Sequence, residues 1–504
     1  MYELSKRTSN FSDSVIRRMT RIANKYDAIN LSQGFPDFAP PKEITDRLAE
    51  VAKMGPHQYA ITWGAQNFRE ALARKHEHFS GMKIDPDSEI VVTCGSTEAM
   101  MASMMSIINP RDKVAIFSPF YENYGADTIL SGAEPIYIPL VPPDFNFDVN
   151  LLEEAFRSGA KALILCNPSN PCGKVFTRKE LENIAELAIK YDAYVITDEV
   201  YEHIIYEPHK HVYMATLPGM RERTIICNSL SKTYSITGWR LGYVIAPPNI
   251  IDRVKKVHDF LTVGAAAPLM EAAVVGLNFS DGYYKELQDH YTHMKKLFVG
   301  GLANLGFQFT EPQGAYYVLM DVSEFGVKDD YKFAEWMTAN VGVAAVPGSS
   351  FFHEDVHNLI RFHFAKEDAT LNEALTRLET LKKKVNNAQN TASVATINYQ
   401  YVLANIPESK SIQENMNKLT EEAQKEFEKS VNEKMSPADI QKVRARVATD
   451  LRQKQINLVK PVQEKINNAI KQVAQEHGYS VVITSDVALF TAVDITEEVL
   501  NAAK

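Results

Sequence analysis

The chain has 504 residues, of which 45% are hydrophobic and 23% are charged, a composition typical of globular proteins. Its length corresponds to about three domains of ordinary size. The formal net charge of -9 leaves no excess of basic residues that would attract nucleic acid or an anionic membrane. Neither is therefore expected as a partner.

The cysteines and the first residues indicate the compartment. Four thiols in so long a chain are no disulfide framework, and none of them has CxxC spacing: Cys94, Cys166, Cys172 and Cys227. The first 19 residues are polar and lack the apolar centre of a signal peptide. No run of about 18 apolar residues is present to cross a membrane. We expect a cytoplasmic protein.

Short apolar runs alternate with helical patterns over residues 1–384. Each run is rich in Val and Ile and ends at a Gly, Pro, Ser, Asn or Asp; examples are 89–95 (EIVVTCG), 112–118 (DKVAIFS), 161–168 (KALILCNP), 193–199 (AYVITDE) and 223–229 (RTIICNS). A helical pattern such as 177–191 lies between two of them. This alternation predicts an α/β fold with a mainly parallel sheet. Functional residues then belong at the carboxyl ends of its strands.

The chain changes character after residue 384. Leu371–Lys384 reads as the last helix of the first region, and 385–393 (VNNAQNTAS) as a linker. Beyond it the sequence predicts a strand over 394–399, two helical stripes over 411–431 and 440–473 separated by Ser436-Pro437, and a returning strand over 480–484. A helical hairpin of this kind buries its apolar stripe poorly alone, so we expect residues 394–504 to self-associate.

The strongest chemical signal is the segment 229–240 (SLSKTYSITGWR), which contains Lys232. A lysine on a loop after a strand suits Schiff-base chemistry. Taken alone, the motif favours an ordinary surface lysine over a catalytic one. Asp198, at the end of another strand, is by itself a candidate helix N-cap.

Three further candidates also have two interpretations each. Asn170 lies in a segment full of turn residues, 167–173 (NPSNPCG). Tyr121 follows a strand and is a candidate core aromatic, whereas Arg361 lies in a strand-like alternation that would also suit a solvent-facing residue.

A candidate phosphate site follows the strand 89–93. Gly95, Ser96 and Thr97 open a helical stretch, and the first backbone N–H groups of a helix bind anions. Ser229 and Arg240 would complete this cradle, because a guanidinium can bind phosphate with two hydrogen bonds.

Residues 10–384 resemble the class I aminotransferases, which are pyridoxal-phosphate (PLP) enzymes of fold-type I, and the matching segments occur in the same order as in that family. Besides segment 229–240, the resemblance rests on Gly34 in SQGFPDF, Tyr59 in HQYAITWG, the loop 167–173, Asp198-Glu-Val-Tyr201 and Arg361 in NLIRFHF. It implies a large PLP-binding domain over 46–284 and a small α+β domain formed by 1–45 and 285–384. No metal is implied.

The resemblance also implies roles for these residues. Lys232 would form the internal aldimine and carry the proton between substrate and cofactor. Asp198 would hold the proton on the pyridine nitrogen, which makes the ring an electron sink. Tyr201 and Asn170 would donate hydrogen bonds to the phenolic oxygen of the ring, and Tyr121 would stack on its face.

The remaining implied roles concern the phosphate and the substrate. Ser96, Thr97, Ser229 and Arg240 would bind the phosphate, and Tyr59 would reach the phosphate of a neighbouring subunit in a homodimer. Arg361 would bind the substrate α-carboxylate, assisted by Asn170 and the Gly34 backbone.

The substrate is less well defined by the sequence. The stretch 262–268 (TVGAAAP) has no second cation for a distal carboxylate, and Trp63, Tyr124 and 29–38 could line an apolar pocket. These features favour aromatic, methionine-like or broad substrates, and SQGFPDF resembles the kynurenine and glutamine aminotransferases. The alternative within the fold is a PLP-dependent C–S β-lyase.

Residues 394–504 resemble the Skp/OmpH family of periplasmic chaperones, on 394–405 and 471–504. The resemblance implies trimer contacts through a helical hairpin, although the hairpin is shorter than is usual in that family. An exported family joined to a cytoplasmic enzyme indicates either an engineered fusion or a natural oligomerisation module. A third hypothesis makes the whole chain a scaffold or holdase.

Overall fold

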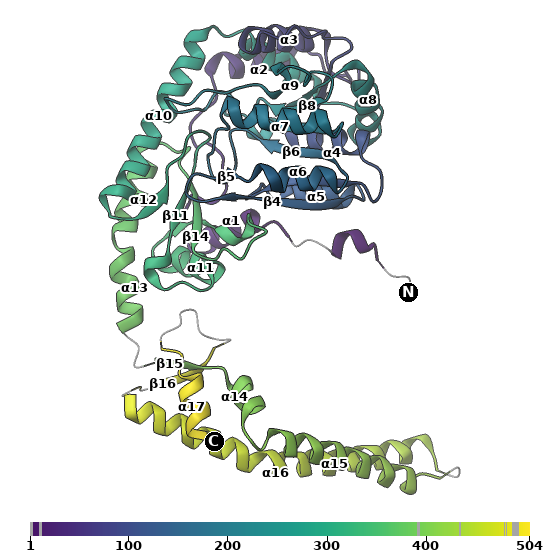
Figure 1. The fold of residues 1–504 in the computed structure, drawn as a ribbon, viewed down its shortest axis with the longest axis vertical. Coiled ribbons are helices and arrows are strands. Elements are labelled where there is room, and N and C mark those ends of the chain that lie inside the picture. Colours follow the sequence, from purple (N-terminus) through teal and green to yellow (C-terminus); the bar gives the residue numbers. More distant parts are fainter. Residues whose placement is uncertain are drawn as a thin grey trace. The chain divides into compact units, whose positions relative to one another are not determined.

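The computed structural model describes residues 4–9, 13–390, 394–432, 435–477, 479, 481–485 and 493–503. The chain forms two compact units, Met1–Leu381 and Lys382–Lys504 (Figure 1).

The first unit is built around a sheet of eight strands in the order β2-β9-β8-β7-β6-β3-β4-β5. These are β2 (Ile90–Thr93), β3 (Lys113–Ser118), β4 (Glu134–Val141), β5 (Asn146–Phe147), β6 (Ala160–Cys166), β7 (Tyr194–Asp198), β8 (Thr224–Ser229) and β9 (Gly242–Ile245). Neighbouring strands from β8 to β4 run parallel, whereas β9 is antiparallel to both β2 and β8, and β5 to β4. The five strands predicted from apolar runs are confirmed, in a sheet that is mainly parallel.

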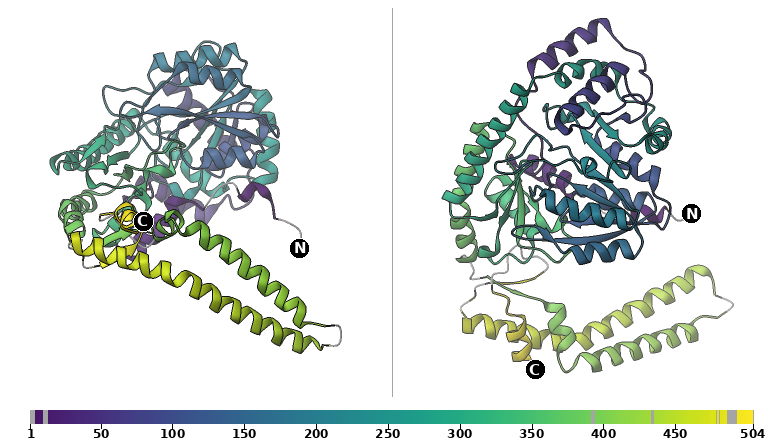
Figure 2. Two further views of the ribbon diagram at one scale, coloured as in Figure 1. Left: turned by 60° about the horizontal axis from the view of Figure 1, so that its bottom comes forward. Right: turned by 45° about the horizontal axis from the view of Figure 1, so that its top comes forward.

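Helices cover both faces of this sheet (Figure 2). They are α2 (Lys42–Met54), α3 (Gln66–Ser80), α4 (Ser96–Ile107), α5 (Asn123–Leu130), α6 (Val149–Arg157), α7 (Arg178–Lys190), α8 (Pro248–Thr262) and α9 (Ala267–Leu277). Alternate side chains of a strand point to opposite faces: Phe117 of β3 packs with α6 and α7, and Ile116 with α4 and α8. Burial on both faces explains why the strands are continuous apolar runs.

The helix predicted within 177–191 is α7. Thr177 caps it by accepting a hydrogen bond from the Glu180 N–H, and the Glu180 side chain accepts one from the Thr177 N–H. This reciprocal capping box satisfies two N–H groups that would otherwise be unpaired.

Antiparallel β9 has a consequence for function. Thr93 and Ser229, the last residues of β2 and β8, both pair with Gly242, the first residue of β9. The chain therefore enters β9 at the edge where the other strands end. Arg240, two residues before β9, lies at this edge together with Ser96.

A second, antiparallel sheet has the order β10-β11-β14-β13. Its strands are β10 (Gln308–Thr310), β11 (Tyr317–Asp321), β13 (Val346–Pro347) and β14 (Leu359–His363). The associated helices are α1 (Val15–Lys25), α10 (Asp281–Asn304), α11 (Asp330–Asn340) and α12 (Asp368–Glu379), and α10 leads from one sheet region to the other (Figure 1). Near the N-terminus, β1 (Ile29–Asn30) pairs in parallel with β12 (Val343–Ala344), which attaches the N-terminal segment to the segment that follows α11.

The second unit contains the predicted strand, helical hairpin and returning strand (Figure 2). Its elements are β15 (Val394–Ile397), α14 (Tyr399–Asn405), α15 (Ser409–Ser430), α16 (Pro437–His477), β16 (Val481–Thr484) and α17 (Thr496–Ala503). β15 and β16 pair in parallel. A small core includes Ile397, Ile466 and Val499, whereas α15 has no buried residue.

Three boundaries differ from the sequence prediction. Residues 385–390, predicted as linker, are helical, because α13 (Leu381–Asn390) continues to Asn390; 391–393 lie outside the described residues. The helix predicted over 371–384 is divided between α12 and α13 at Thr380. The strand predicted to reach Tyr399 ends at Ile397, because Asn398 caps α14 with its side chain.

Among the helices that the described residues form, none combines the length and the apolar character that crossing a membrane requires.

Candidate active site

A cavity of about 440 Å³ lies where the strands of the large sheet end. Nearly all predicted site residues line it: Gly34, Ser96, Thr97, Tyr121, Asn170, Asp198, Tyr201, Ser229, Lys232, Arg240 and Arg361. The turns after β6, β7 and β8 supply Asn170, Tyr201 and Lys232, as expected for a sheet of this topology.

Lys232 is not a surface lysine. Its Nζ donates a hydrogen bond to the Gly34 carbonyl oxygen at 3.2 Å and lies 5.8 Å from the ring centre of Tyr201. Burial lowers the pKa of Lys232 to about 8, although the charge of Asp198 opposes this shift. The neutral amine, which is the nucleophilic form, is therefore far more populated near neutral pH than in an exposed lysine.

Asp198 ends β7 and is followed by a turn rather than a helix, so the N-cap interpretation is wrong. The Tyr124 hydroxyl donates to its Oδ2 at 2.6 Å. Burial raises the pKa of Asp198 above its usual range, although the Tyr124 hydrogen bond partly offsets this. A cation on the cavity side would stabilise the ionised form of this carboxylate, and the carboxylate would in turn stabilise the protonated form of that cation.

Arg361 lies on β14 and is fully buried, so the solvent-facing interpretation is wrong. Its Nη1 donates to Asn170 Oδ1 at 2.6 Å and its Nη2 to the Ser32 carbonyl oxygen at 2.7 Å. The guanidinium is 4.3 Å from the ring centre of Tyr317 and 4.5 Å from that of Phe351. Its Nε is buried without a hydrogen-bond partner.

Asn170 combines the two interpretations left open by its sequence. The loop that carries it is a turn, and the turn directs the amide to Arg361. Because Oδ1 accepts from that guanidinium, the Nδ2 group is the donor that remains.

Tyr201 and Gly34 meet at Tyr317. The Tyr201 and Tyr317 hydroxyl oxygens are 2.9 Å apart. A Cβ at Gly34 would lie 2.2 Å from the Tyr317 hydroxyl oxygen, so only glycine allows this approach. Tyr317 was not predicted from the sequence. The continuous apolar run 315–320 (AYYVLM) is consistent with a buried strand but does not indicate which tyrosine faces the cavity.

The predicted phosphate cradle depends on close backbone approach. Gly95 has a φ of 84°, and a Cβ there would lie 2.2 Å from Arg240 Nη2. A Cβ at Gly242 would lie 2.3 Å from the Gly95 carbonyl carbon. The two glycines let the Arg240 guanidinium lie over the first turn of α4, where Ser96 and Thr97 begin the helix.

Two residues differ from the expected arrangement. Tyr59 is 88% exposed and lies outside the cavity. Trp63, a candidate wall of an apolar pocket, lies instead beneath the Lys255 ammonium, 4.6 Å from its ring centre. Tyr124 does line the cavity, but as the hydrogen-bond donor to Asp198. Gln33, Gly34 and Phe35 represent the segment 29–38.

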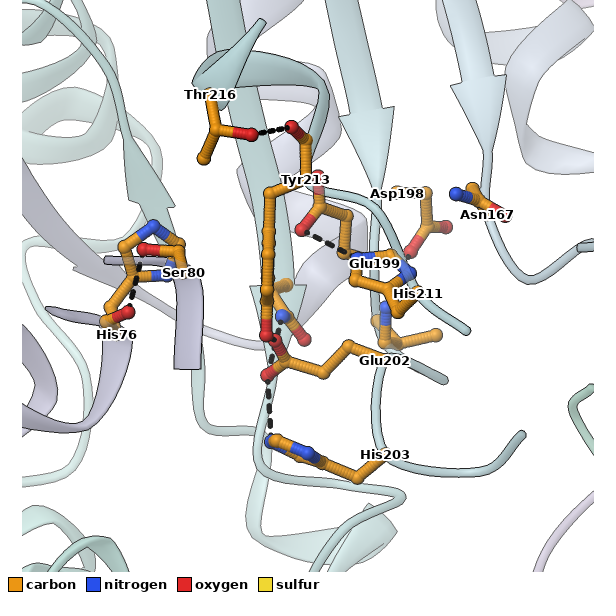
Figure 3. Close-up of polar contacts among 12 residues, drawn as sticks. His76, Ser80, Asn167, Asp198, Glu199, Glu202, His203, His211, Tyr213 and Thr216 are labelled. Atoms are coloured by element: carbon orange, nitrogen blue, oxygen red, sulfur yellow. Dashed lines mark hydrogen bonds and ion pairs between the residues drawn. The ribbon is translucent and has the colours of Figure 1, made fainter. Parts of the chain in front are cut away.

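A buried polar network supports the turns after β7 and β8 (Figure 3). Glu202 accepts from the Tyr213 hydroxyl at 2.7 Å and from Asn228 Nδ2 at 3.1 Å, and it pairs with the buried Lys75 ammonium at 2.9 Å. Burial would raise the pKa of Glu202, but the Lys75 charge outweighs it and holds the pKa well below the usual range. Asn228 Oδ1 in turn accepts from the Ser229 N–H at 2.7 Å. Glu202 thus connects the turn of Asp198 to the loop of Lys232.

The model for the family "Aminotransferase class I and II" matches residues 26–378. A methionine aminotransferase from Escherichia coli (strain K12) is 36% identical over 369 residues, which cover 73% of this chain and 96% of that protein. A kynurenine–oxoglutarate transaminase from Dictyostelium discoideum is 33% identical, over 76% of this chain and 97% of that protein.

Solved structures give the same comparison. The crystal structure of the methionine aminotransferase from Escherichia coli has a TM-score of 0.73 at 34% identity and covers 75% of this chain and 100% of its own. The aspartate aminotransferase from Thermus thermophilus has a TM-score of 0.70 at 29% identity, with 76% and 100% covered. In the second unit, the model for "Outer membrane protein (OmpH-like)" matches residues 436–502.

The network around Glu202 yields a stability prediction. Lys75→Met leaves the buried Glu202 carboxylate without its cation, which should cost about 3 kcal/mol and lower the midpoint of thermal unfolding. Adding Glu202→Gln should restore part of the loss, because the neutral amide needs no cation. Lys42→Met is the matched control, since its pair with Asp46 is exposed and exposed pairs contribute little to stability. Equal losses for Lys75→Met and Lys42→Met would contradict the prediction.

Proposed function

Because the chain belongs to the aminotransferases of class I and II and folds as a PLP enzyme of fold-type I, we propose that it moves the amino group of an L-amino acid to a 2-oxo acid. Both resemblances identified in the sequence are confirmed. The observation that carries the proposal is the meeting of Lys232, Asp198 and Arg361 in one cavity. The reaction would run as two half-reactions, in which the first product leaves before the acceptor enters.

PLP is the cofactor of this family, and the residues present fit it. The close approach of Arg240 to Gly95 places a guanidinium beside the first N–H groups of α4, and these two groups together would bind a dianion. Ser96, Thr97 and Ser229 would add hydrogen bonds to it, and Tyr121 would lie against the ring. When bound, PLP supplies an aldehyde that a lysine can hold covalently and a ring that accepts electrons.

The residues of the chain would divide the remaining work. Asp198 would hold a proton on the ring nitrogen, because a buried carboxylate needs a cationic neighbour. Tyr201 Oη and Asn170 Nδ2 would donate to the phenolic oxygen. Lys232 Nζ would hold the cofactor and then move the proton to and from the substrate α carbon. Its pKa of about 8 suits an amine that both accepts and returns a proton.

Arg361 would bind the α-carboxylate of the substrate. Its guanidinium is held by two neutral acceptors and by two aromatic rings, so its position is fixed while its charge remains uncompensated. A substrate carboxylate would supply that charge.

For the substrate side chain we propose an aromatic, methionine-like or broad specificity. Ile16, Phe35 and Tyr121 contribute apolar surface to the cavity. The similarity to proteins named for methionine and kynurenine points the same way. Arg17 and Glu122 also line the cavity, and their charges would allow polar substrates to bind as well.

A panel of amino acids distinguishes transamination from the alternative, a C–S β-lyase. With stoichiometric enzyme and no acceptor, methionine, kynurenine or phenylalanine should bleach the absorbance of the lysine-bound cofactor and release one equivalent of 2-oxo acid. Aspartate should react at least tenfold more slowly, given about 1–3 kcal/mol of side-chain discrimination. Ammonia and pyruvate from a cysteine conjugate, without bleaching, would instead identify a lyase.

Replacing the lysine tests the assignment of the site. Lys232→Ala should still bind PLP through the phosphate cradle but should lose the covalent complex and lower kcat by at least about 10⁴-fold, because both the nucleophile and the proton carrier are gone. Absorbance spectra and single-turnover rates measure this. Retained turnover would overturn the role of Lys232, and a wild-type chain without turnover would favour the scaffold or holdase hypothesis.

We further propose that the first unit forms a homodimer, with a large domain over 46–284 and a small domain formed by 1–45 and 285–384. Large apolar side chains are exposed around the end of α8 and the segment before α3: Met54, Tyr59, Ile61, Phe260, Leu261 and Val263. These two segments contact each other, since His258 Nε2 is 2.8 Å from the Thr62 carbonyl oxygen. Exposed apolar side chains gathered in this way favour an interface with a second copy of the chain. Tyr59 would then reach the phosphate bound by that copy. The four cysteines are free thiols, which is consistent with the reducing conditions of the cytoplasm.

The second unit would act as a trimerisation module. The apolar stripe of α15 packs on α16, but none of its residues is fully buried, which leaves apolar surface for a further chain to cover. The chaperone activity of the OmpH-like family is not part of the proposal.

Mass in solution tests both interfaces. A two-fold and a three-fold contact on one chain should give assemblies of at least six copies, about 340 kDa for a chain of 56.6 kDa. Phe260→Asp should break the two-fold contact and leave a trimer of about 170 kDa. Light scattering after gel filtration measures both. A plain dimer of about 113 kDa would exclude the trimeric role of the second unit.

A further inference from the structure

A second buried polar group lies next to the phosphate cradle, outside the cavity. It joins Glu98 in the first turn of α4 to His258 and Thr262 near the end of α8. His258 Nδ1 is 2.7 Å from Glu98 Oε1, and the Thr262 hydroxyl donates to the same oxygen at 2.8 Å. The His258 side chain is fully buried and that of Glu98 is 8% exposed.

The geometry defines the protonation state of His258. Its Nε2 faces the Thr62 carbonyl oxygen at 2.8 Å, and a carbonyl only accepts hydrogen bonds, so Nε2 carries a proton. Its Nδ1 faces a carboxylate oxygen, which in the ionised state also only accepts. With Glu98 ionised, both nitrogens donate, and the ring is an imidazolium.

The surrounding charges agree with this state. Burial would lower the pKa of His258, but the Glu98 hydrogen bond and charge outweigh it and raise the pKa above its ordinary value, with help from Asp259. Burial likewise would raise the pKa of Glu98, and His258 and the Cys94 N–H hold it below its usual range. The other titratable group on this side is the Cys94 thiol, which lies beside Glu98. Burial and the Glu98 charge raise the pKa of Cys94, and the Arg240 charge opposes this shift.

The position of Glu98 makes its charge important. Glu98 is two residues from Ser96, which begins α4, in the turn whose N–H groups would bind the phosphate. An uncompensated carboxylate there would repel a dianion, since like charges at this range oppose binding. The imidazolium cancels that charge.

The pair also connects three chain segments. Glu98 accepts from the Cys94 N–H in the cradle loop. His258 donates to Thr62 in the segment that carries Tyr59, and the Cys94 thiol donates to the Gly264 carbonyl oxygen beyond α8. A change at His258 therefore reaches the cradle and the exposed apolar segment together.

We propose that His258 and Glu98 are positioning residues for the phosphate cradle, and that His258 does this as an imidazolium that neutralises Glu98. This inference rests on the proposed function, because it assumes that the cradle binds the phosphate of PLP. Neither residue lines the cavity.

The test compares four full-length proteins: wild type, His258→Gln, Glu98→Gln and the double variant. PLP is titrated into each apoenzyme at pH 6 and pH 9, and the dissociation constant is measured by absorbance. Ratios between proteins remove the titration of the phosphate and of Lys232, which all four share. His78→Gln is the matched control, because His78 pairs with Asp281 at an exposed site.

His258→Gln should weaken PLP binding about tenfold at pH 6, the size expected for one uncompensated charge near a dianion. The difference should shrink from pH 6 to pH 9, because a rising pH favours the neutral form of wild-type His258. The double variant carries no charge at either position and should recover to within about threefold of wild type at pH 6. Glu98→Gln should remove the pH dependence contributed by the pair, and His78→Gln should leave binding unchanged.

Unfolding of the apoenzyme gives a second readout. A histidine whose pKa is raised on folding stabilises the protein fully below its unfolded value, about 6.5, and this stabilisation is lost as the pH rises through the folded value. The unfolding midpoint of wild type should therefore exceed that of His258→Gln by more at pH 6 than at pH 9.

A double variant as weak as His258→Gln, or losses that do not change with pH, would overturn the inference and leave a packing role only. If His258→Gln does not fold, Glu98→Gln decides alone, because it should bind PLP at pH 9 at least as tightly as wild type. The proposed function fails separately: if Lys232→Ala keeps the covalent complex, the cofactor site itself is wrong, whatever His258 does.

Discussion

The hydrogen bond between Arg361 and Asn170 is the contact on which the arrangement of the cavity depends. Arg361 lies on β14 of the second sheet and Asn170 on the loop after β6 of the large sheet. A fully buried guanidinium is costly unless its donors are used, so the two sheets must meet in the register that provides these acceptors. That register also places Gly34 beneath Tyr317, and Lys232 against the Gly34 carbonyl. One buried cation thus fixes where the amine, the carboxylate site and the tyrosines face each other.

The same burial shifts the two central ionisable groups in opposite directions. It lowers the pKa of Lys232 to about 8 and raises that of Asp198, because each charged form is less stable away from water. Lys232 thereby becomes available as a neutral amine, and Asp198 gains affinity for a cation. The polar network at Glu202 holds both turns in place, so the chemistry depends on side chains that never reach the cavity.

Sequence patterns predicted the parts of the structure that depend on local chemistry. The five apolar runs form strands, and their apolar character is continuous because a parallel sheet is buried on both faces. Eleven of the predicted site residues line one cavity. Contacts between distant segments were not predictable in this way. Tyr317, the hydrogen bond from Tyr124 to Asp198 and the Glu98–His258 pair depend on which helix packs on which strand. The prediction of a linker over 385–390 was wrong for a local reason. These residues include no Gly or Pro that would end a helix, so α13 continues through them.

The buried charges of the first unit explain why Arg361 is special. Lys75 is paired with Glu202, Lys174 with Glu180, Arg69 with Asp87 and His258 with Glu98. Each pair satisfies the rule that a buried ion needs a counter-ion nearby. Among the ion pairs that the described residues form, Arg361 takes part in none, and its Nε has no acceptor. Lys366 is also buried without an ion pair among the described residues, but its ammonium lies over the Phe35 ring and does not line the cavity. Arg361 does line the cavity, so an anion that enters there can supply the missing charge. The α-carboxylate of an amino acid is such an anion, and it enters through the cavity that Lys232 faces.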